Sequence, residues 1–473
     1  MATSQAEEVV IPMEHRGAGA DHGDDLLLGR AVPWVCRQSI APRVWQDADP
    51  LGLWTESNGS EGCYGGWELL FPVGAEPGDE LILELAAEAE ALPRGTDELV
   101  VEAFWYDAEG AEVNWDPVLL DRVDAAGDSR LAVRYAKSLR FPAGAKRLGV
   151  RCGLRWSPSG RVRWHSWRLN RQATRPNRTL RLGVASGRQG RWVDLQTSIA
   201  HYVEQCRNAG QAGIDLVCLP ETILSAGSPD RDPEALPGLA VPLPGSWLEP
   251  FQAVAREYRM GICFSVLERA GANDEVVYNT ALLLGRDGGL IGTYRKVHLA
   301  IKEVRQGVTA GHDFPVFDFE GTTVGMGICM DSSAAETCRV LAQRGAEIML
   351  MPIMGDFRAT NWVHGNTVFD IERWKLVQRA HAFDNHLYVV VARNVNYGSA
   401  ITAPWGEILA YNDGDREVIW SDVDLDRLRS HPLGTSVQAV LSAMRRPYVY
   451  ASLADTTYPV GSLNQRGRLA RRE

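Results

Sequence analysis

Three reactive side chains each follow an apolar stretch of this chain. Glu221 ends "IDLVCLPE", Lys296 ends "GLIGTYRK", and Cys329 follows "VGMGI". In α/β sheets, ligands bind outside the carboxyl ends of the strands. A carboxylate, an ammonium group and a thiol at that edge are suited to acyl transfer at a C–N bond, because they supply a base, an oxyanion partner and a nucleophile. Taken singly, each residue also has a structural interpretation, as a turn residue, a solvated strand end or a buried thiol.

A second cysteine, Cys338, lies nine residues after Cys329 in a different setting. Cys329 lies between a predicted strand and a predicted helix, where helix N–H groups and the helix dipole favour a thiolate. Cys338 falls on one face of that helix together with Ala335, Leu341 and Ala342. We therefore predict that Cys329 is the nucleophile and that Cys338 packs in the core.

From residue 180 onward, the segments that position these side chains alternate between strand and helix patterns. The predicted strands are 180–186, 214–220, 260–268, 322–330, 346–353 and 386–393. The predicted helices are 194–213, 246–258 (capped by Ser246), 334–345 and 362–385. A hairpin is predicted at 276–296 across "RDGG". This alternation predicts a layered α/β domain.

The residues before the polar stretch 170–183 have a different pattern. Short segments, several of them alternating and separated by turns such as "AEPGD" and "SPSG", predict an antiparallel β-sandwich, although 79–92 also fits a helix. We therefore expect a flexible N-terminus at 1–25, a β-sandwich domain at 26–172 and an α/β domain at 178–425. A C-terminal extension at 426–473 is expected to make oligomer contacts.

The overall composition excludes several classes of protein. The formal net charge of −11 argues against general binding to nucleic acids or anionic membranes. The start of the chain lacks a signal-peptide pattern, and no apolar run approaches the ~20 residues that span a bilayer. The eight cysteines include no CxxC pair and no zinc-ligand spacing, so we expect a reducing cytoplasmic compartment, no metal site and no cofactor.

The order Glu221, Lys296, Cys329, in the contexts "LPE", "YRKVHL" and "GICMD", resembles the nitrilase superfamily of carbon–nitrogen hydrolases. The resemblance extends over about 180–425 and includes Glu336, "RAHAFDN" and "YGSAITAPWGEILA". It implies a four-layer αββα sandwich with Glu221, Lys296 and Cys329 as the catalytic triad. It also implies a supporting role for Glu303, whose alternative is a surface salt bridge.

The resemblance implies a thioester mechanism on a small-molecule amide. Glu221 removes the thiol proton, the sulfur attacks the amide carbon, and the Lys296 ammonium and the Met330 backbone N–H are the donors expected at the oxyanion. From their position in the loop after the strand 346–353, three residues are expected to contact substrate: Asp356, Phe357 and His364.

The residues after Cys329 bear on the choice of reaction. True nitrilases place Trp-Glu after the cysteine, whereas this chain has "CMDS", which favours amides. The family pattern is also broken by "AAE" at 334–336 and by His381 in "RAHA". His381 is expected to be a buried structural residue or to line the pocket or a subunit contact. Hydrolysis of N-carbamoyl compounds or nitriles and a catalytically idle scaffold remain the alternatives.

Two expectations concern the parts outside the triad. The N-terminal domain contains nine of the tryptophans and weakly resembles carbohydrate-binding jelly rolls, so either packing and assembly or sugar binding is expected. The resemblance also implies a homo-oligomer, at least a dimer, with contacts through the helix of Trp374 and the layer of Cys338.

Overall fold

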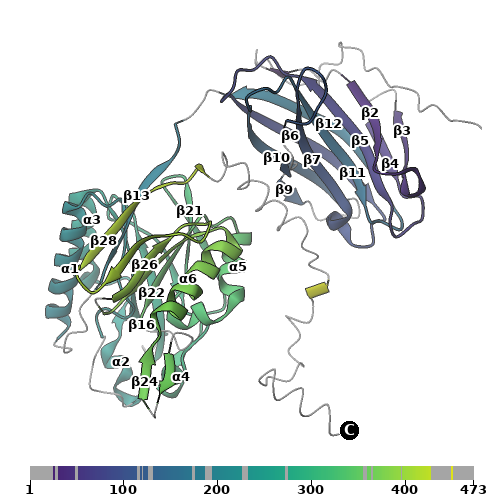
Figure 1. The fold of residues 1–473 in the computed structure, drawn as a ribbon. Helices are drawn as coiled ribbons and strands as arrows, with labels where there is room; N and C mark the ends of the chain where they lie inside the picture. The colour runs from purple at the N-terminus through teal and green to yellow at the C-terminus, as the bar shows by residue number, and fades with distance from the viewer. Residues whose placement is uncertain are drawn as a thin grey trace, which may run out of the picture. The chain divides into compact units, whose positions relative to one another are not determined.

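The computed structural model describes residues 25–26, 30–47, 52–113, 118–119, 121–125, 131–172, 176–186, 194–225, 233–271, 275–354, 360–363, 366–395, 397–427 and 449–450. The chain divides into two compact units, Met1–Pro176 with Arg427–Glu473, and Asn177–Asp426 (Figure 1). Almost all of the N-terminal segment 1–25 and of the extension 426–473 lies outside the described residues. Within those described, no helix is both long and apolar enough to cross a bilayer.

The first unit contains two antiparallel sheets, as the alternating segments predict. One sheet has the order β3 (Arg43–Asp47), β4 (Gly52–Glu56), β12 (Arg161–Gln172), β6 (Glu80–Glu90), β10 (Leu131–Arg140), β9 (Asp121–Ala125), with β1 (Asp25–Leu26) beside β12. The other has the order β2 (Arg30–Val35), β5 (Tyr64–Pro72), β11 (Arg147–Arg155), β7 (Leu99–Tyr106), β8 (Val118–Leu119). Two short 3-10 helices join them, η1 (Gln38–Ile40) and η2 (Gly95–Glu98).

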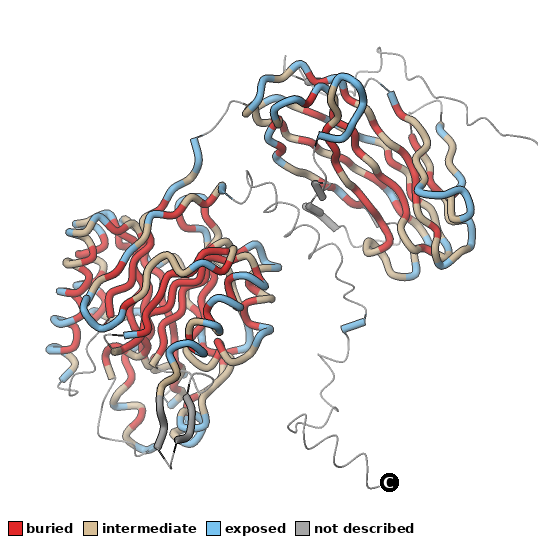
Figure 2. Tube along the Cα trace, in the orientation of Figure 1, coloured by how far each residue is buried: buried red, intermediate tan, exposed pale blue. Residues whose placement is uncertain are grey.

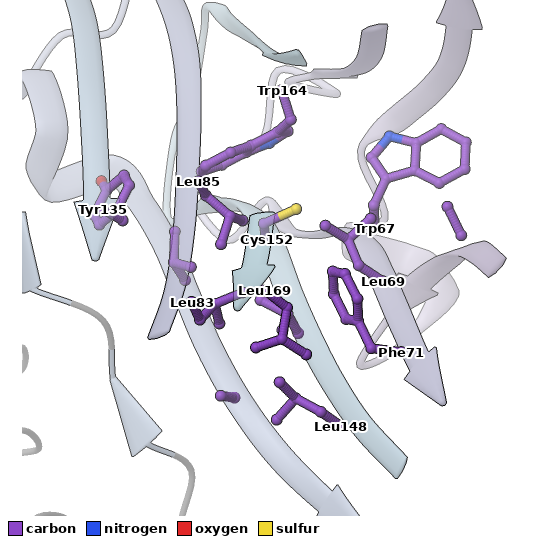
Figure 3. Packing of buried hydrophobic residues seen from close by; sticks show 14 of the residues in the cluster. Trp67, Leu69, Phe71, Leu83, Leu85, Tyr135, Leu148, Cys152, Trp164 and Leu169 are labelled. Atoms are coloured by element: carbon purple, nitrogen blue, oxygen red, sulfur yellow. The ribbon is translucent and has the colours of Figure 1, made fainter. Parts of the chain in front are cut away.

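The core of this unit lies between the two sheets. Leu83 and Leu85 in β6 are buried at alternate positions, which is why this segment is a strand and not the alternative helix. They pack with Trp164 from the same sheet and with Trp67 and Leu148 from the other sheet (Figure 3). Several of the N-terminal tryptophans therefore serve core packing.

The second unit contains two further sheets. The larger has the order β18 (Leu290–Arg295), β17 (Val276–Leu284), β16 (Gly261–Ala270), β14 (Leu216–Cys218), β13 (Thr179–Ala185), β28 (Val418–Asp424), with β15 (Val241–Pro242) beside β16 and β19 (Val308–Thr309) beside β17. The smaller has the order β20 (Val316–Phe319), β21 (Thr322–Met326), β22 (Ile348–Ile353), β25 (Tyr388–Arg393), β26 (Tyr397–Thr402), β27 (Ile408–Asp413). The predicted hairpin is β17 and β18.

Helices cover the outer face of each of these sheets. The helices of the unit are α1 (Leu195–Gln211), α2 (Leu236–Leu239), α3 (Glu249–Tyr258), α4 (Ile301–Arg305), α5 (Ala335–Gln343) and α6 (Ile371–Asn385). α1 and α3 pack on the larger sheet, and α5 and α6 pack on the smaller one. A third cluster of buried residues lies between the sheets, and Figure 2 shows the buried residues gathered along the central strands. The unit is the expected four-layer αββα sandwich.

Two predicted helix boundaries were wrong. The helix expected at 362–385 begins at Ile371, because the Asp370 side chain accepts a hydrogen bond from the Arg373 backbone N–H at 3.0 Å and caps it. The preceding residues form the hairpin β23 (Thr360–Val363) and β24 (Asn366–Phe369). Ser246 does not cap α3: it begins the 3-10 helix η4 (Ser246–Leu248), which follows η3 (Pro233–Ala235).

Candidate active site

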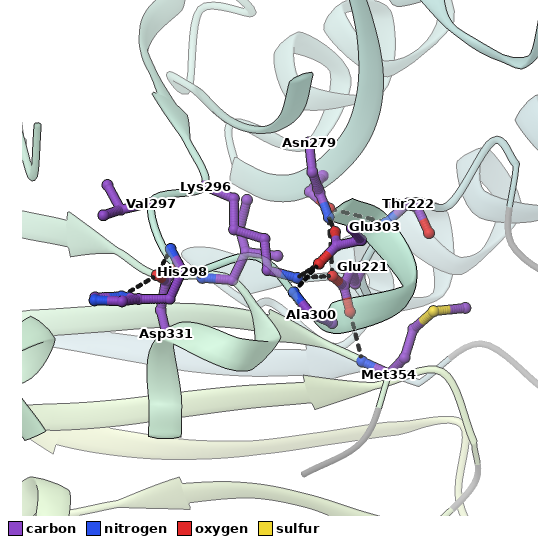
Figure 4. Close-up of polar contacts among 12 residues, drawn as sticks. Glu221, Thr222, Asn279, Lys296, Val297, His298, Ala300, Glu303, Asp331 and Met354 are labelled. Atoms are coloured by element: carbon purple, nitrogen blue, oxygen red, sulfur yellow. Dashed lines mark hydrogen bonds and ion pairs between the residues drawn. The ribbon is translucent and has the colours of Figure 1, made fainter. Parts of the chain in front are cut away.

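Glu221 and Lys296 meet in the interior of the second unit. Glu221 follows β14 and is 3% exposed, and Lys296 follows β18 and is 1% exposed. Lys296 Nζ donates to Glu221 Oε1 at 2.8 Å, and the Met354 backbone N–H after β22 donates to Glu221 Oε2 at 3.0 Å (Figure 4). Two residues separated by 75 positions are thus held together at the carboxyl ends of β14 and β18, two strands of the larger sheet.

Glu303 and Asn279 complete this buried cluster. Glu303 in α4 accepts from Lys296 Nζ at 2.7 Å and from the Ala300 backbone N–H at 2.7 Å. Asn279 Nδ2 lies 2.9 Å from Glu221 Oε1 and 2.8 Å from Glu303 Oε1, so it bridges the two carboxylates. Glu303 therefore pairs with a buried lysine and does not form a surface salt bridge. Asn279 was missed, although a polar residue inside the apolar run "VVYNTALLL" was a usable signal.

The surroundings of Lys296 keep its side chain charged. Burial by itself lowers the pKa of Lys296, but the carboxylates of Glu221 and Glu303 and the neighbouring Cys329 sulfur outweigh burial, and the pKa is raised. An ammonium group that stays protonated cannot act as a general base at neutral pH. It is suited to stabilising negative charge that develops beside it.

Cys329 lies at a tight turn after β21. It begins the 3-10 helix η5 (Cys329–Ser333), is partly exposed, and has a φ of 43°, a left-handed conformation that non-glycine residues rarely adopt. A Cβ atom on Gly327 would lie 2.6 Å from Met349 Cε, so a larger residue just before this turn would displace the end of the Met349 side chain. The thiol packs against the cluster between the sheets and also against the cluster under α5 and α6.

Asp331 ties this turn to the segment that carries Lys296. It is fully buried and accepts from the Ile328 backbone N–H (2.8 Å), the Tyr294 hydroxyl (2.7 Å) and the His298 backbone N–H (3.0 Å). Asp331 Oδ1 also lies 2.9 Å from His298 Nδ1, and the hydrogen bond that it accepts from the protonated ring raises the pKa of His298. Asp331 connects the turn of Cys329 to residues on both sides of Lys296.

Cys338 and His381 form a buried contact behind the turn. Cys338 is fully buried, as predicted, with its Sγ 3.3 Å from His381 Nδ1 and 3.4 Å from Met349 Sδ. His381 Nε2 lies 2.9 Å from the carbonyl oxygen of Ser332 in η5. Because that oxygen only accepts, Nε2 carries the proton, and His381 is a buried structural residue that links α6 to the turn of Cys329.

The remaining predicted residues are less well defined. Met330 directly follows Cys329 in η5, and its role at the oxyanion stays a prediction. Asp356, Phe357 and His364 lie outside the described residues. Trp374 is fully buried on α6, and its indole N–H donates to the Gly398 carbonyl at 2.6 Å. Among the described residues, no group of three or more His, Cys, Asp or Glu side chains is arranged to hold a metal ion.

Comparison with known proteins places this unit in a family. The family model described as carbon-nitrogen hydrolase matches residues 181–432. Omega-amidase NIT2 of Homo sapiens is 31% identical over 239 residues, which are 47% of this chain and 81% of that protein. A probable nitrilase of Schizosaccharomyces pombe is 32% identical over 182 residues, which are 37% of this chain and 62% of that protein.

A solved structure has the same fold. The carbon-nitrogen hydrolase from Helicobacter pylori G27 aligns with a TM-score of 0.50 at 20% identity and covers 59% of this chain and 99% of that chain. The matched region of the family model contains the buried Glu221–Lys296 pair and the turn of Cys329. The chain therefore belongs to the carbon-nitrogen hydrolases of the nitrilase superfamily and is an amidase-like hydrolase.

Proposed function

We propose that this chain hydrolyses a small-molecule amide to a carboxylic acid and ammonia or an amine, with Glu221, Lys296 and Cys329 as its catalytic triad. The observation that carries the proposal is the buried ion pair of Glu221 and Lys296, at 2.8 Å, whose lysine is electrostatically coupled to Cys329. A buried ion pair on which nearby ionisable groups converge is a common feature of catalytic sites.

In the acylation step, Glu221 accepts the thiol proton of Cys329, and the sulfur attacks the amide carbon. The carbonyl oxygen becomes negative, and the Lys296 ammonium and the Met330 backbone N–H stabilise it. Glu221 then returns the proton to the leaving nitrogen as the C–N bond breaks. The products of this step are a thioester on Cys329 and free ammonia or amine.

In the deacylation step, Glu221 removes a proton from water, which attacks the thioester carbon. Collapse of this intermediate releases the carboxylic acid, and the thiol regains its proton. Glu303 and Asn279 are positioning residues, since both hold the oxygens of Glu221 or the ammonium of Lys296 in place.

The sequence after Cys329 and the name of the relatives, omega-amidase, favour a primary amide at the end of an acyl chain. An N-carbamoyl compound is the second candidate, because the same triad attacks a ureido carbon. Nitriles are the third candidate substrate class, since the chain lacks the Trp-Glu pair after the cysteine. Asp356, Phe357 and His364 stay candidates for substrate contact from their position in sequence.

The test is a screen of the full-length chain against primary amides, N-substituted amides, N-carbamoyl compounds and nitriles. Ammonia with a carboxylic acid identifies a primary amidase, free amine an N-substituted amidase, and ammonia with carbon dioxide and amine a carbamoyl hydrolase. Intact mass of the wild-type chain quenched during turnover is expected to show an acyl adduct on Cys329. Turnover that persists in Cys329→Ala would refute the proposal.

A further inference from the structure

The backbone turns directly after Glu221, at Thr222. Thr222 has a φ of 46°, a left-handed conformation, and it is the one β-branched residue among the described non-glycine residues with a positive φ. Branching at Cβ makes this conformation more costly than it is for most other side chains. Such strain persists where neighbouring groups enforce it. The groups that enforce it at Thr222 therefore also act on the backbone of Glu221.

The other left-handed residues of this unit occur where such a conformation is expected or at the second turn of the site. Arg259 and His386 end the helices α3 and α6, and helices commonly end in this way. Glu320 lies in the turn between β20 and β21. Among the described residues of the unit, Thr222 and Cys329 remain, and each lies at a turn of the proposed triad.

A single buried residue, Ser265 in β16, holds the turn at Thr222. The Thr222 backbone N–H donates to Ser265 Oγ at 2.8 Å, and the Ile223 backbone N–H donates to the Ser265 carbonyl at 3.0 Å. Ser265 is fully buried, and Ile223 is 2% exposed. A hydroxyl inside the apolar run "GICFSV" is costly to bury unless it is hydrogen-bonded, and the bond from Thr222 offsets that cost. Two successive N–H groups after Glu221 are thus fixed to one strand residue.

The strand next to Ser265 holds the carboxylate of Glu221. Ser265 in β16 pairs with Ala281 in β17. β17 also carries Asn279, whose Nδ2 lies 2.9 Å from Glu221 Oε1 (Figure 4). The backbone after Glu221 and the carboxylate of Glu221 are therefore attached to adjacent strands of one sheet. A change in the conformation of Thr222 would move the backbone relative to the contacts of the carboxylate.

We propose that Ser265 is a positioning residue of the hydrolase: it holds Thr222 in the left-handed conformation and so fixes Glu221 for proton transfer with Cys329. The inference rests on the proposed function, in which Glu221 is the base. Proton transfer requires the two heavy atoms at hydrogen-bond distance, so a small displacement of the carboxylate slows it strongly. Ser265 lies outside the motifs by which the triad is identified.

The first test removes the hydroxyl of Ser265 in the full-length chain. With the primary amide that has the highest kcat/KM in the screen, Ser265→Ala is expected to lower kcat by about 10-fold or more with little change in KM. The reason is that the substrate still binds but proton transfer is misaligned. Ser186→Ala is the matched control, because Ser186 is also a fully buried serine, with its Oγ 3.2 Å from Asn412 Nδ2. This control should leave kcat unchanged.

A second substitution shows whether Ser265 acts through Thr222. Glycine adopts a positive φ without strain, so it does not need Ser265 to enforce the turn. Thr222→Gly is therefore expected to keep most of kcat by itself and to restore most of the kcat lost in Ser265→Ala. Glu320→Gly, at a left-handed position in another turn, is the control and should restore none of it. A serine that only filled the core would not be rescued by a change at Thr222.

Thermal unfolding of every variant separates positioning from folding. If Ser265→Ala does not fold, Ser265→Cys replaces it, since cysteine fills the same space with a weaker acceptor and should show the same loss of kcat. A wild-type kcat in the folded Ser265 variant, with Cys329→Ala inactive, would overturn this inference and leave the amidase function standing. A loss that Thr222→Gly fails to restore in a folded double variant would also overturn it. Absence of hydrolysis of every amide by the wild type would refute the proposed function, and this inference with it.

Discussion

The thiols of Cys329 and Cys338 lie nine residues apart in sequence but in different surroundings. Cys329 is partly exposed at a positive φ, whereas Cys338 is fully buried against Met349 and His381. A left-handed backbone costs a non-glycine residue on the order of 1–3 kcal/mol and persists where its neighbours enforce it. Here Asp331 enforces it through the Ile328 backbone N–H.

The two cysteines are expected to respond differently to the same substitution. Cys329→Ala should abolish turnover with little change in the thermal transition, because it removes only the nucleophile. Cys338→Ala should keep most of the activity and lower the free energy of unfolding by about 1 kcal/mol, as a small core truncation does. Amidase assays and calorimetry on both variants check this, and an active Cys329→Ala would reverse the assignment.

Removing either member of the buried ion pair is expected to slow the chemical step. Glu221→Gln keeps the shape but loses the base, and Lys296→Ala loses the positive charge beside the oxyanion, so each should lower kcat by about 100-fold or more. Glu268→Gln is the control, since Glu268 is also buried but pairs with Arg295 and Thr280. Comparable loss of kcat in the control would point to folding as the cause.

The contact between His298 and Asp331 is expected to make stability depend on pH. The hydrogen bond that Asp331 accepts from His298 raises the pKa of His298 in the folded chain. The resulting stabilisation is fully present below the unfolded value of about 6.5 and is lost as the pH rises through the folded value. His298→Gln should therefore destabilise the chain more at pH 5.5 than at pH 8.5. Thermal unfolding at both pH values tests this, and a larger effect at pH 8.5 would contradict it.

At the residue scale, the sequence predicted the residues whose neighbours form short recognisable contexts. Glu221, Lys296 and Glu303 were assigned in this way, and the structure brings them together. Asn279 and Asp331 were not assigned, because their importance lies in partners 58 and 37 residues away. Only the folded chain shows that such a side chain is buried and which groups it forms hydrogen bonds with.

At the scale of elements, two segments could be assigned either to a helix or to a strand from their local sequence. The segment 79–92 is rich in Ala and Glu, which favour helix, but pairing with β10 and β12 makes it strand β6. The segment 362–370 was assigned to a helix, although it contains β-branched and aromatic residues and forms a hairpin instead. In the first case the two partner strands, which a local pattern does not reveal, decided the structure, whereas in the second the partner strand is adjacent in sequence.

His381 and Cys338, which link α6 to η5, are expected to affect the free energy of unfolding non-additively. His381→Ala should lower the free energy of unfolding by about 1–3 kcal/mol, because it removes the imidazole contacts with the Ser332 carbonyl and the Cys338 thiol. The double variant with Cys338→Ala should lose less than the sum of the single losses, since both remove one contact. Calorimetry on the four chains measures this coupling, and strict additivity would show that the contact contributes nothing.

At the scale of the whole molecule, α6 exposes large apolar side chains. Leu376 is 64% exposed, Phe383 51% and Ile371 40%. Exposed apolar surface of this kind commonly marks an interface. We propose that α6 packs against a second copy of the chain. The charged double variant Leu376→Glu with Phe383→Glu should then be monomeric by light scattering, and Glu372→Gln should remain an oligomer. A monomeric wild type would refute this.

The ends of the hydrolase unit lie side by side in its larger sheet. β13 and β28 pair antiparallel from Thr179 with Asp424 to Ala185 with Val418. Beyond them, Asn177 donates to Asp424 at 2.7 Å, and Arg178 bonds both Asp426 and Glu347. The chain therefore enters and leaves the hydrolase unit at one place, the paired strands β13 and β28. Any segment before or after the unit attaches there, at a place remote in sequence from Glu221, Lys296 and Cys329. A fragment that starts at Thr179 would keep this strand pairing but lose the contacts of Asn177 and Arg178, whereas one that starts before Asn177 keeps both. A neighbouring domain can therefore be exchanged at this place without moving a strand that carries the triad.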